Sequence, residues 1–154
     1  MSGSPFKDVA RITLIMGAAF TIAICFQVYV KVSSTLAYKA RGERFQRYHS
    51  QDPVMTKADR LVGNLVEWGF VFWPLLFSLA LAVSATDDDG QNNSHYITAA
   101  YVYALSRLMY VLVGITCTRF HASGDATKTP LILFTAPAYV CLMYMTYELV
   151  LLAL

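Results

Sequence analysis

The sequence has little charge and few of the features of soluble or secreted proteins. Only 14% of its 154 residues are charged, whereas about 25% is typical of soluble domains. Its three cysteines form no CxxC pair and its three histidines are scattered, so we predict neither a disulfide framework nor a zinc site. The net charge of +2 and the lack of a binding motif argue against a nucleic-acid role. The length fits a single domain over residues 1–154.

Long apolar segments dominate the chain instead. Four of them run from about Val9 to Leu36, Leu61 to Ala85, Tyr96 to Phe120 and Pro130 to Leu154. A spanning helix needs roughly 20 mostly apolar residues, and lipid offers backbone groups no partner outside a helix. The segments also lack the strict alternation of a membrane β-barrel. The sequence therefore predicts an all-α integral membrane protein, a bundle of four transmembrane helices.

The connections between these segments divide by charge. The connection between the first two segments carries the basic residues Lys39, Arg41, Arg44, Arg47, Lys57 and Arg60. Arg119 and Lys128 lie near the third connection, on the same side, while the second connection contains three aspartates at 87–89. The positive-inside rule places the basic side in the cytosol, or in the matrix of mitochondria. We therefore expect a membrane of the endoplasmic reticulum or another organelle, including the mitochondrial inner membrane.

The second apolar segment begins with polar side chains on one helical face. Arg60, Asn64 and Glu67 follow each other at spacings of four and three, which brings them to the same side of a helix. Arg60 can extend its head group to water, but Glu67 lies about 10 Å further along. A charge at that depth costs about 2.5–3.5 kcal/mol on insertion scales. Glu67 is therefore expected to have a partner.

The third segment offers a candidate partner for this carboxylate. Tyr103, Arg107, Tyr110 and Gly114 also share one helical face. Counted from the basic side, Glu67 and Arg107 lie within about two turns in depth, which a long arginine side chain can bridge. We expect a Glu67–Arg107 pair. It is interpreted either as a fastener between two helices or as part of a functional site.

The two polar motifs together resemble those of a known family. Arg60-x-x-x-Asn64-x-x-Glu67 in the second segment and Arg107-x-x-Tyr110 in the third are similar to motifs of the MAPEG family, the membrane-associated proteins in eicosanoid and glutathione metabolism. Its members include microsomal glutathione transferases, leukotriene C synthase and the lipoxygenase-activating protein. The four-segment plan, the chain length and the basic first connection are similar too. The resemblance covers most of the chain as a plan and is specific at the two motifs.

This resemblance implies a homotrimer with glutathione bound between neighbouring subunits near the basic side. Arg60 would meet a carboxylate of glutathione, which suits the guanidinium fork. Asn64 and Glu67 would hold the polar groups of the peptide, with Glu67 facing its free amine. Tyr110 would hydrogen-bond the other end, and Arg107 would support that wall. Glutathione is thus the predicted cofactor, and membrane lipids are the predicted surroundings.

The part of the family site that activates the thiol is different in this chain. Gly114 stands where the leukotriene-synthase pattern has a second tyrosine, and His121 where it has an arginine thought to stabilise the thiolate. A free thiol has a pKa of about 8.5 and is mostly protonated at neutral pH, so a nearby cation is needed. Arg119 and His121 are the catalytic candidates for this role, although His121 serves only when protonated. Trp68 stands where the pattern has a tyrosine after the glutamate.

Three functions of different classes remain open at this point. The first is a glutathione-dependent transferase or peroxidase acting on lipophilic electrophiles or lipid hydroperoxides. The second is a lipid-presenting adaptor without catalysis. The third is a catalytically silent structural subunit of a larger complex, with other membrane-protein subunits as partners. Gly114 and His121 favour the second and third functions. The first is favoured by the four predicted binding residues Arg60, Asn64, Glu67 and Tyr110.

Overall fold

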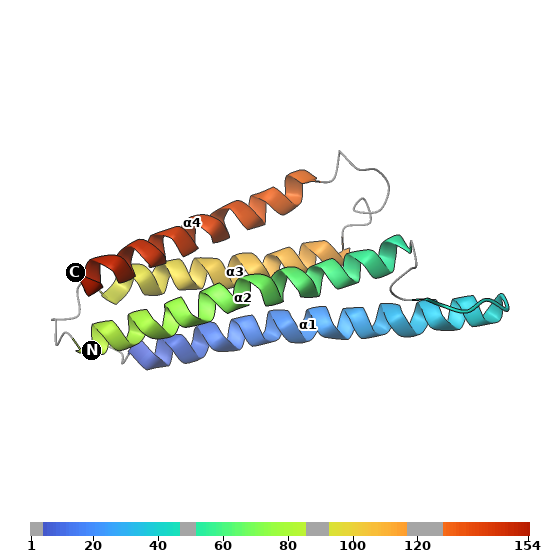
Figure 1. The fold of residues 1–154 in the computed structure, drawn as a ribbon, viewed down its shortest axis with the longest axis horizontal. Helices are drawn as coiled ribbons and strands as arrows, with labels where there is room; N and C mark the ends of the chain where they lie inside the picture. The colour runs from blue at the N-terminus through green and yellow to red at the C-terminus, as the bar shows by residue number, and fades with distance from the viewer. Residues whose placement is uncertain (1–4, 47–51, 86–92, 117–127) are drawn as a thin grey trace.

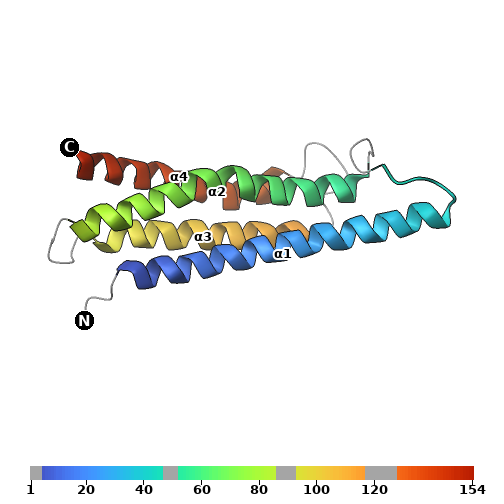
Figure 2. The same cartoon turned by 60° about the horizontal axis from the view of Figure 1, so that its bottom comes forward.

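Four long helices run side by side, in alternating directions. The computed structural model of the chain describes residues 5–46, 52–85, 93–116 and 128–154. The helices are α1 (Pro5–Ala40), α2 (Pro53–Ala85), α3 (Asn93–Thr116) and α4 (Lys128–Ala153). Both chain termini lie at the same end of the bundle (Figures 1 and 2). We call the opposite end, where α1 ends and α2 begins, the basic end. The predicted four-helix, all-α architecture is confirmed.

The start of α2 lies earlier in the sequence than hydropathy indicated. The helix begins at Pro53 rather than near Leu61. The Oδ1 atom of Asp52 accepts hydrogen bonds from the backbone N–H groups of Val54 at 2.9 Å and Met55 at 3.2 Å. An acidic cap followed by proline is a typical helix start, because proline has no N–H to leave unpaired there. The polar residues near position 60 therefore lie well inside a helix.

The end of α1 is closed by a glycine turn. Gly42 has a φ of 73°, a conformation that side chains disfavour. The N–H of Glu43 donates to the carbonyl of Tyr38 at 3.0 Å, and the N–H of Gly42 donates to that of Lys39 at 3.0 Å. This pair of bonds is a Schellman motif, which satisfies the last carbonyls of a helix. It stops α1 beyond the apolar segment, so the helix is longer than a bilayer requires.

The helices enclose an aromatic and aliphatic core. α3 packs against α4 and α1, α1 packs against α2, and α2 also packs against α4. Phe72 of α2 stacks on Tyr103 of α3, with ring centres 4.1 Å apart and planes 13° from parallel. Pro74 and Pro137 lie inside continuous helices. Cys141 is buried, whereas Cys25 is exposed.

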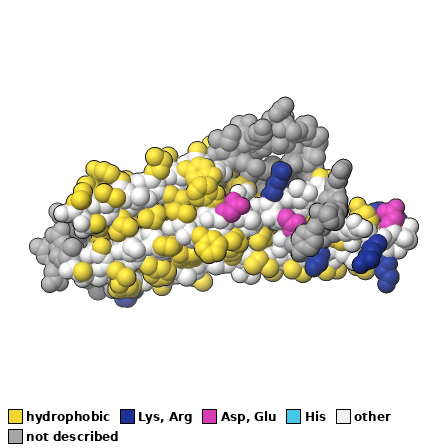
Figure 3. Space-filling model, in the orientation of Figure 1, with side chains coloured by type: hydrophobic (Ala, Val, Ile, Leu, Met, Phe, Trp, Pro, Cys, Tyr) yellow, Lys and Arg dark blue, Asp and Glu magenta, His cyan; other side chains and the backbone are white. Residues whose placement is uncertain are grey.

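The outer surface of the bundle is apolar along most of its length. Leu14, Phe70 and Met143 are 75%, 77% and 74% exposed. Hydrophobic side chains cover most of the face in Figure 3, and most of the lysines and arginines in view lie toward the basic end. Apolar patches of this extent do not occur on ordinary soluble monomers. Each of the four helices is long and apolar enough to cross a membrane.

Candidate functional site

A cavity of about 390 Å³ opens between α2 and α3 toward the basic end. We call it the polar cavity. Its lining residues are Pro53, Thr56, Lys57, Arg60, Leu61 and Asn64 of α2 and Tyr110 of α3. The α2 residues recur at spacings of three and four, so one stripe of the helix forms the wall. The structure thus brings together three predicted site residues, Arg60, Asn64 and Tyr110.

A hydrogen bond joins the two sides of the polar cavity. The Nδ2 atom of Asn64 donates to the Tyr110 hydroxyl oxygen at 2.6 Å. Tyr110 is only 5% exposed, so its ring is held by the surrounding helices. Because the hydroxyl oxygen accepts this bond, its own hydrogen remains to donate to another group. The pair therefore presents a positioned hydroxyl and an amide carbonyl on a fixed wall.

The charges at this cavity are of one sign. Arg60 is exposed at its edge, and Lys57 lies in its wall with 8% exposure. No aspartate or glutamate belongs to the described lining. Two basic groups beside neutral hydrogen-bonding groups suit an anion with further polar atoms, because charge-assisted bonds to carboxylates are the strong ones. Lys57 was interpreted from the sequence only as a topology signal; its spacing of three from Arg60 was the sign that it shares this wall.

Gly114 lies close to Leu61 of α2, on the helix that carries Tyr110. A β-carbon at this position would lie 2.6 Å from the Cδ2 atom of Leu61. Leu61 is 2% exposed and lines the polar cavity. A larger side chain at position 114 would therefore displace Leu61.

Arg107 does not reach the polar cavity. Its side chain is 1% exposed, and its guanidinium carbon lies 5.2 Å from the ring centre of Tyr103 and 5.7 Å from that of Tyr139. Its Nε and Nη2 atoms have no hydrogen-bond partner among the described residues. The two aromatic faces attract the cation. Arg107 is thus held between α3 and α4 rather than turned toward α2.

The predicted Glu67–Arg107 pair is not formed. The Glu67 side chain is exposed on the outer face of α2, and within the described parts of the chain it makes no ion pair or hydrogen bond. The neighbouring Trp68 contacts Tyr139 edge-on at 4.5 Å between ring centres. Tyr139 therefore contacts both Trp68 of α2 and the guanidinium of Arg107. Glu67 and Arg107 make no contact because the Glu67 side chain points outward, whereas the Arg107 side chain is buried.

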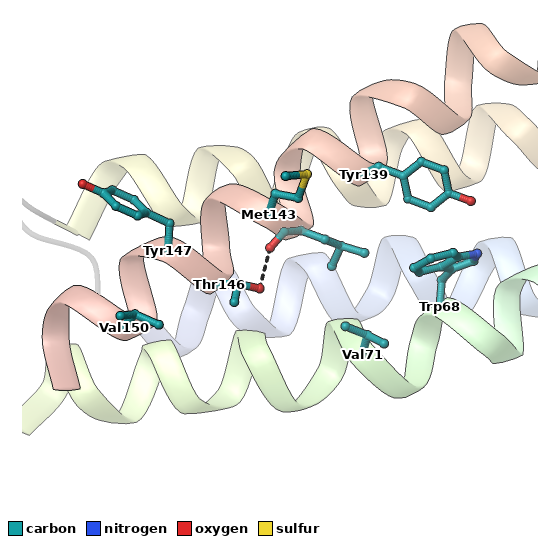
Figure 4. A pocket seen from close by; sticks show the side chains of 8 residues that line it. Trp68, Val71, Tyr139, Met143, Thr146, Tyr147 and Val150 are labelled. Carbon is teal, nitrogen blue, oxygen red and sulfur yellow. Dashed lines mark hydrogen bonds between the residues drawn. The ribbon is translucent and has the colours of Figure 1, made fainter. Parts of the chain in front are cut away.

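A second hollow, which we call the apolar groove, lies between α2 and α4 and has a volume of about 610 Å³. Its lining residues are Trp68 and Val71 of α2 and Tyr139, Leu142, Met143, Thr146, Tyr147 and Val150 of α4. Figure 4 shows Trp68 and Tyr139 meeting at one end, with Met143 and Tyr147 further along α4. This groove was not predicted from the sequence, although the spacing of four between Tyr139, Met143 and Tyr147 indicated one shared face.

The remaining predicted site residues and metal binding can be stated briefly. Arg119 and His121 lie outside the described residues. Within the described ranges, no cluster of three histidine, cysteine, aspartate or glutamate side chains could hold a metal ion. No family model matches the chain, and no curated protein or solved structure matches it significantly. The polar cavity and the apolar groove, both along α2, are therefore the two candidate functional sites.

Proposed function

We propose that this chain is a glutathione-dependent membrane protein, a transferase or peroxidase similar to MAPEG enzymes, that acts on lipophilic electrophiles or lipid hydroperoxides. The observation that carries the proposal is the hydrogen bond from Asn64 to Tyr110 in a cavity edged by Arg60. The cavity volume of about 390 Å³ falls within the roughly 300–1,000 Å³ of small-molecule sites. These three residues come from the two motifs on which the family resemblance depends.

The donor set of the polar cavity fits the chemistry of glutathione. Arg60 suits a carboxylate of glutathione, and the Tyr110 hydroxyl and Asn64 amide suit its peptide groups. Glutathione supplies a thiol nucleophile when it is bound. Basic side chains beside that thiol favour its ionised form. Glu67 lies one turn from Asn64 but does not line the cavity, so the proposed binding site does not include it.

Thiolate absorbance during a glutathione titration tests this function. The purified protein in detergent is expected to bind glutathione and to increase absorbance near the thiolate band. Tyr110→Phe, which removes only the hydroxyl, should weaken binding by about ten-fold, since bonds to charged or polarised groups contribute about 1.5–3 kcal/mol. Tyr147→Phe is the matched control, because that tyrosine is exposed in the apolar groove. Unchanged affinity in Tyr110→Phe would refute the assigned site.

A second candidate function is supported by the differences from the MAPEG pattern. Gly114 leaves no room for a second tyrosine, and Arg107 is enclosed away from the polar cavity. A chain that binds but does not activate the thiol would be a lipid-presenting adaptor or a structural subunit of a larger membrane complex. Glutathione binding without a thiolate signal would favour the adaptor, and loss of both would favour the subunit.

The assembly and location follow from the same resemblance and the charge pattern. We propose a homotrimer if the chain is an enzyme, and association with other membrane subunits if it is not. The basic end faces the cytosol, or the mitochondrial matrix, by the positive-inside rule. Cross-linking in native membranes distinguishes the two assemblies. Protease access to a tag near Arg44 tests the orientation, because that exposed residue lies at the basic end.

A further inference from the structure

Glu67 is exposed on the outer face of α2, level with the middle of α4. Its level is given by its neighbour Trp68, which contacts Tyr139 near the middle of α4. Val66 and Phe70, on either side of it in the sequence, are 41% and 77% exposed apolar residues. Within the described residues, the carboxylate has neither an ion pair nor a hydrogen bond. A lone acidic group at this depth marks a contact with something that lipid tails cannot replace.

The carboxylate borders the apolar groove. Glu67 and Val71 are four residues apart, so they share a face of α2, and Val71 lines the groove. The groove runs along α4 past Met143 and Tyr147, which are both exposed. Its shape and chemistry suit the side chains of an apolar helix, and methionine adapts to such partners. A polar anchor therefore lies beside an apolar, elongated surface.

Among the described residues of a second copy, no exposed cation lies at the depth of Glu67. Rotation about an axis normal to the membrane leaves every residue at its own depth. Phe20 of α1 is level with Gly69, since a β-carbon on Gly69 would lie 3.7 Å from its ring. At about 1.5 Å per residue, Lys31 lies about 16 Å beyond Phe20, and Arg60 lies about 10 Å from Glu67 toward the basic end, where its head group extends to water rather than toward the middle of the membrane.

The one cation at the depth of Glu67 in the described chain is enclosed. Arg107 is 1% exposed behind the ring of Tyr139, so it cannot meet a carboxylate on another copy. Among the described residues no cation of a second copy meets Glu67 at its own depth, which favours a different chain as the source of the complementary charge.

We propose that Glu67 and the apolar groove form a docking surface for a transmembrane helix of a different protein that carries a lysine or arginine near the middle of the membrane. The apolar face of that helix fills the groove, and its cation pairs with the Glu67 carboxylate. Such pairs orient helices within a membrane, because the charge has no other favourable position. The surface is separate from the polar cavity, so this proposal goes beyond the proposed function.

Designed peptides in phosphatidylcholine vesicles test this surface directly. The full-length protein is labelled with a donor dye, and the partner is a leucine–alanine spanning helix with either lysine or leucine at its centre. Energy transfer should show at least ten-fold tighter association of the lysine peptide. Glu67→Gln should reduce that preference to less than two-fold. The control Glu148→Gln, which removes a half-buried carboxylate of α4 outside the groove lining, should keep it.

A larger side chain in the apolar groove tests the contribution of groove shape to binding separately from that of the Glu67 charge. Val71→Trp should weaken association of both peptides by at least five-fold, whereas Leu14→Trp, on the 75% exposed surface of α1, should leave it unchanged. Equal binding of the two peptides to the wild type would overturn the proposal. So would a full lysine preference in Glu67→Gln. Self-association that Glu67→Gln abolishes, without a peptide preference, would assign the surface to a second copy and overturn the choice of partner.

Discussion

The polar cavity and the apolar groove lie one after the other along the same helix, yet their chemistry differs completely. The cavity presents Arg60 and Asn64 near the basic end, whereas the groove presents Trp68 and Val71 further along α2. Only depth separates them, since both are bounded by the same helical stripe. Polar groups are tolerated where water and head groups are close, and aromatic and aliphatic groups replace them deeper. Glu67, between the two, is the exception that requires a partner.

The two hollows also differ in what holds them open. A single hydrogen bond between Asn64 and Tyr110 spans the polar cavity. The groove is shaped by ring contacts, with Trp68 against Tyr139 and Tyr139 against the guanidinium of Arg107. A hydrogen bond specifies direction, while ring contacts mainly fill volume. We therefore expect the cavity to select its ligand by polar groups, and the groove to select by shape.

The largest effect is expected at the core that supports both hollows. Phe72 is fully buried and stacks on Tyr103. Phe72→Ala should lower the free energy of unfolding by about 3 kcal/mol, the lower end of the roughly 3–5 for such changes. The lower end applies because lipid provides little transfer energy and the packing loss remains. Phe70→Ala, at a lipid-facing site 77% exposed, is the control and should cost less than about 1 kcal/mol. Thermal unfolding in detergent measures both; equal losses would contradict the assigned core.

The next largest effect concerns the charge at the polar cavity. Arg60→Gln keeps length and hydrogen-bonding groups but removes the charge, so glutathione affinity should fall ten- to hundred-fold, or about 1.4–2.7 kcal/mol. Lys31→Gln removes an exposed charge on α1 at the same end and is the matched control. Calorimetric titration at two salt concentrations measures the difference. If both variants bind alike, the cavity attracts anions only through the general charge of the basic end.

The four helices could be predicted from the sequence because hydropathy alone reports a membrane span. The start of α2 could not be predicted that way, since Pro53 begins a polar first turn outside the apolar segment. The cap at Asp52 was the local sign of that start. Spacing within one helix correctly grouped Arg60 and Asn64. Spacing contains no information about how two helices rotate against each other, which is why the expected partner of Glu67 was wrong.

A smaller effect is expected for the contribution of the Asn64–Tyr110 hydrogen bond to stability. Asn64→Ala and Tyr110→Phe each remove one end of the 2.6 Å bond. Their combined loss of stability should be less than the sum by about 0.5–1.5 kcal/mol, the net contribution of one such bond. A double-mutant cycle of unfolding free energies measures this coupling. Full additivity would show that the bond contributes nothing to holding the cavity in shape.

A last pair of changes compares two glycines, Gly63 of α2 and Gly114 of α3. Gly63 lies in the interior of α2 with no atom within 4 Å of a β-carbon, whereas a β-carbon on Gly114 would lie 2.6 Å from Leu61. Gly63→Ala should stabilise the protein by about 0.5–1 kcal/mol, because alanine loses less backbone entropy in a helix. Gly114→Ala gains the same backbone-entropy stabilisation. However, the new methyl group displaces the buried Leu61 side chain, and such overpacking costs about 1–3 kcal/mol. We therefore expect opposite signs for the two changes in thermal unfolding. If Gly114→Ala also stabilises, Leu61 can yield, and the wall of the cavity is softer than its close packing indicates.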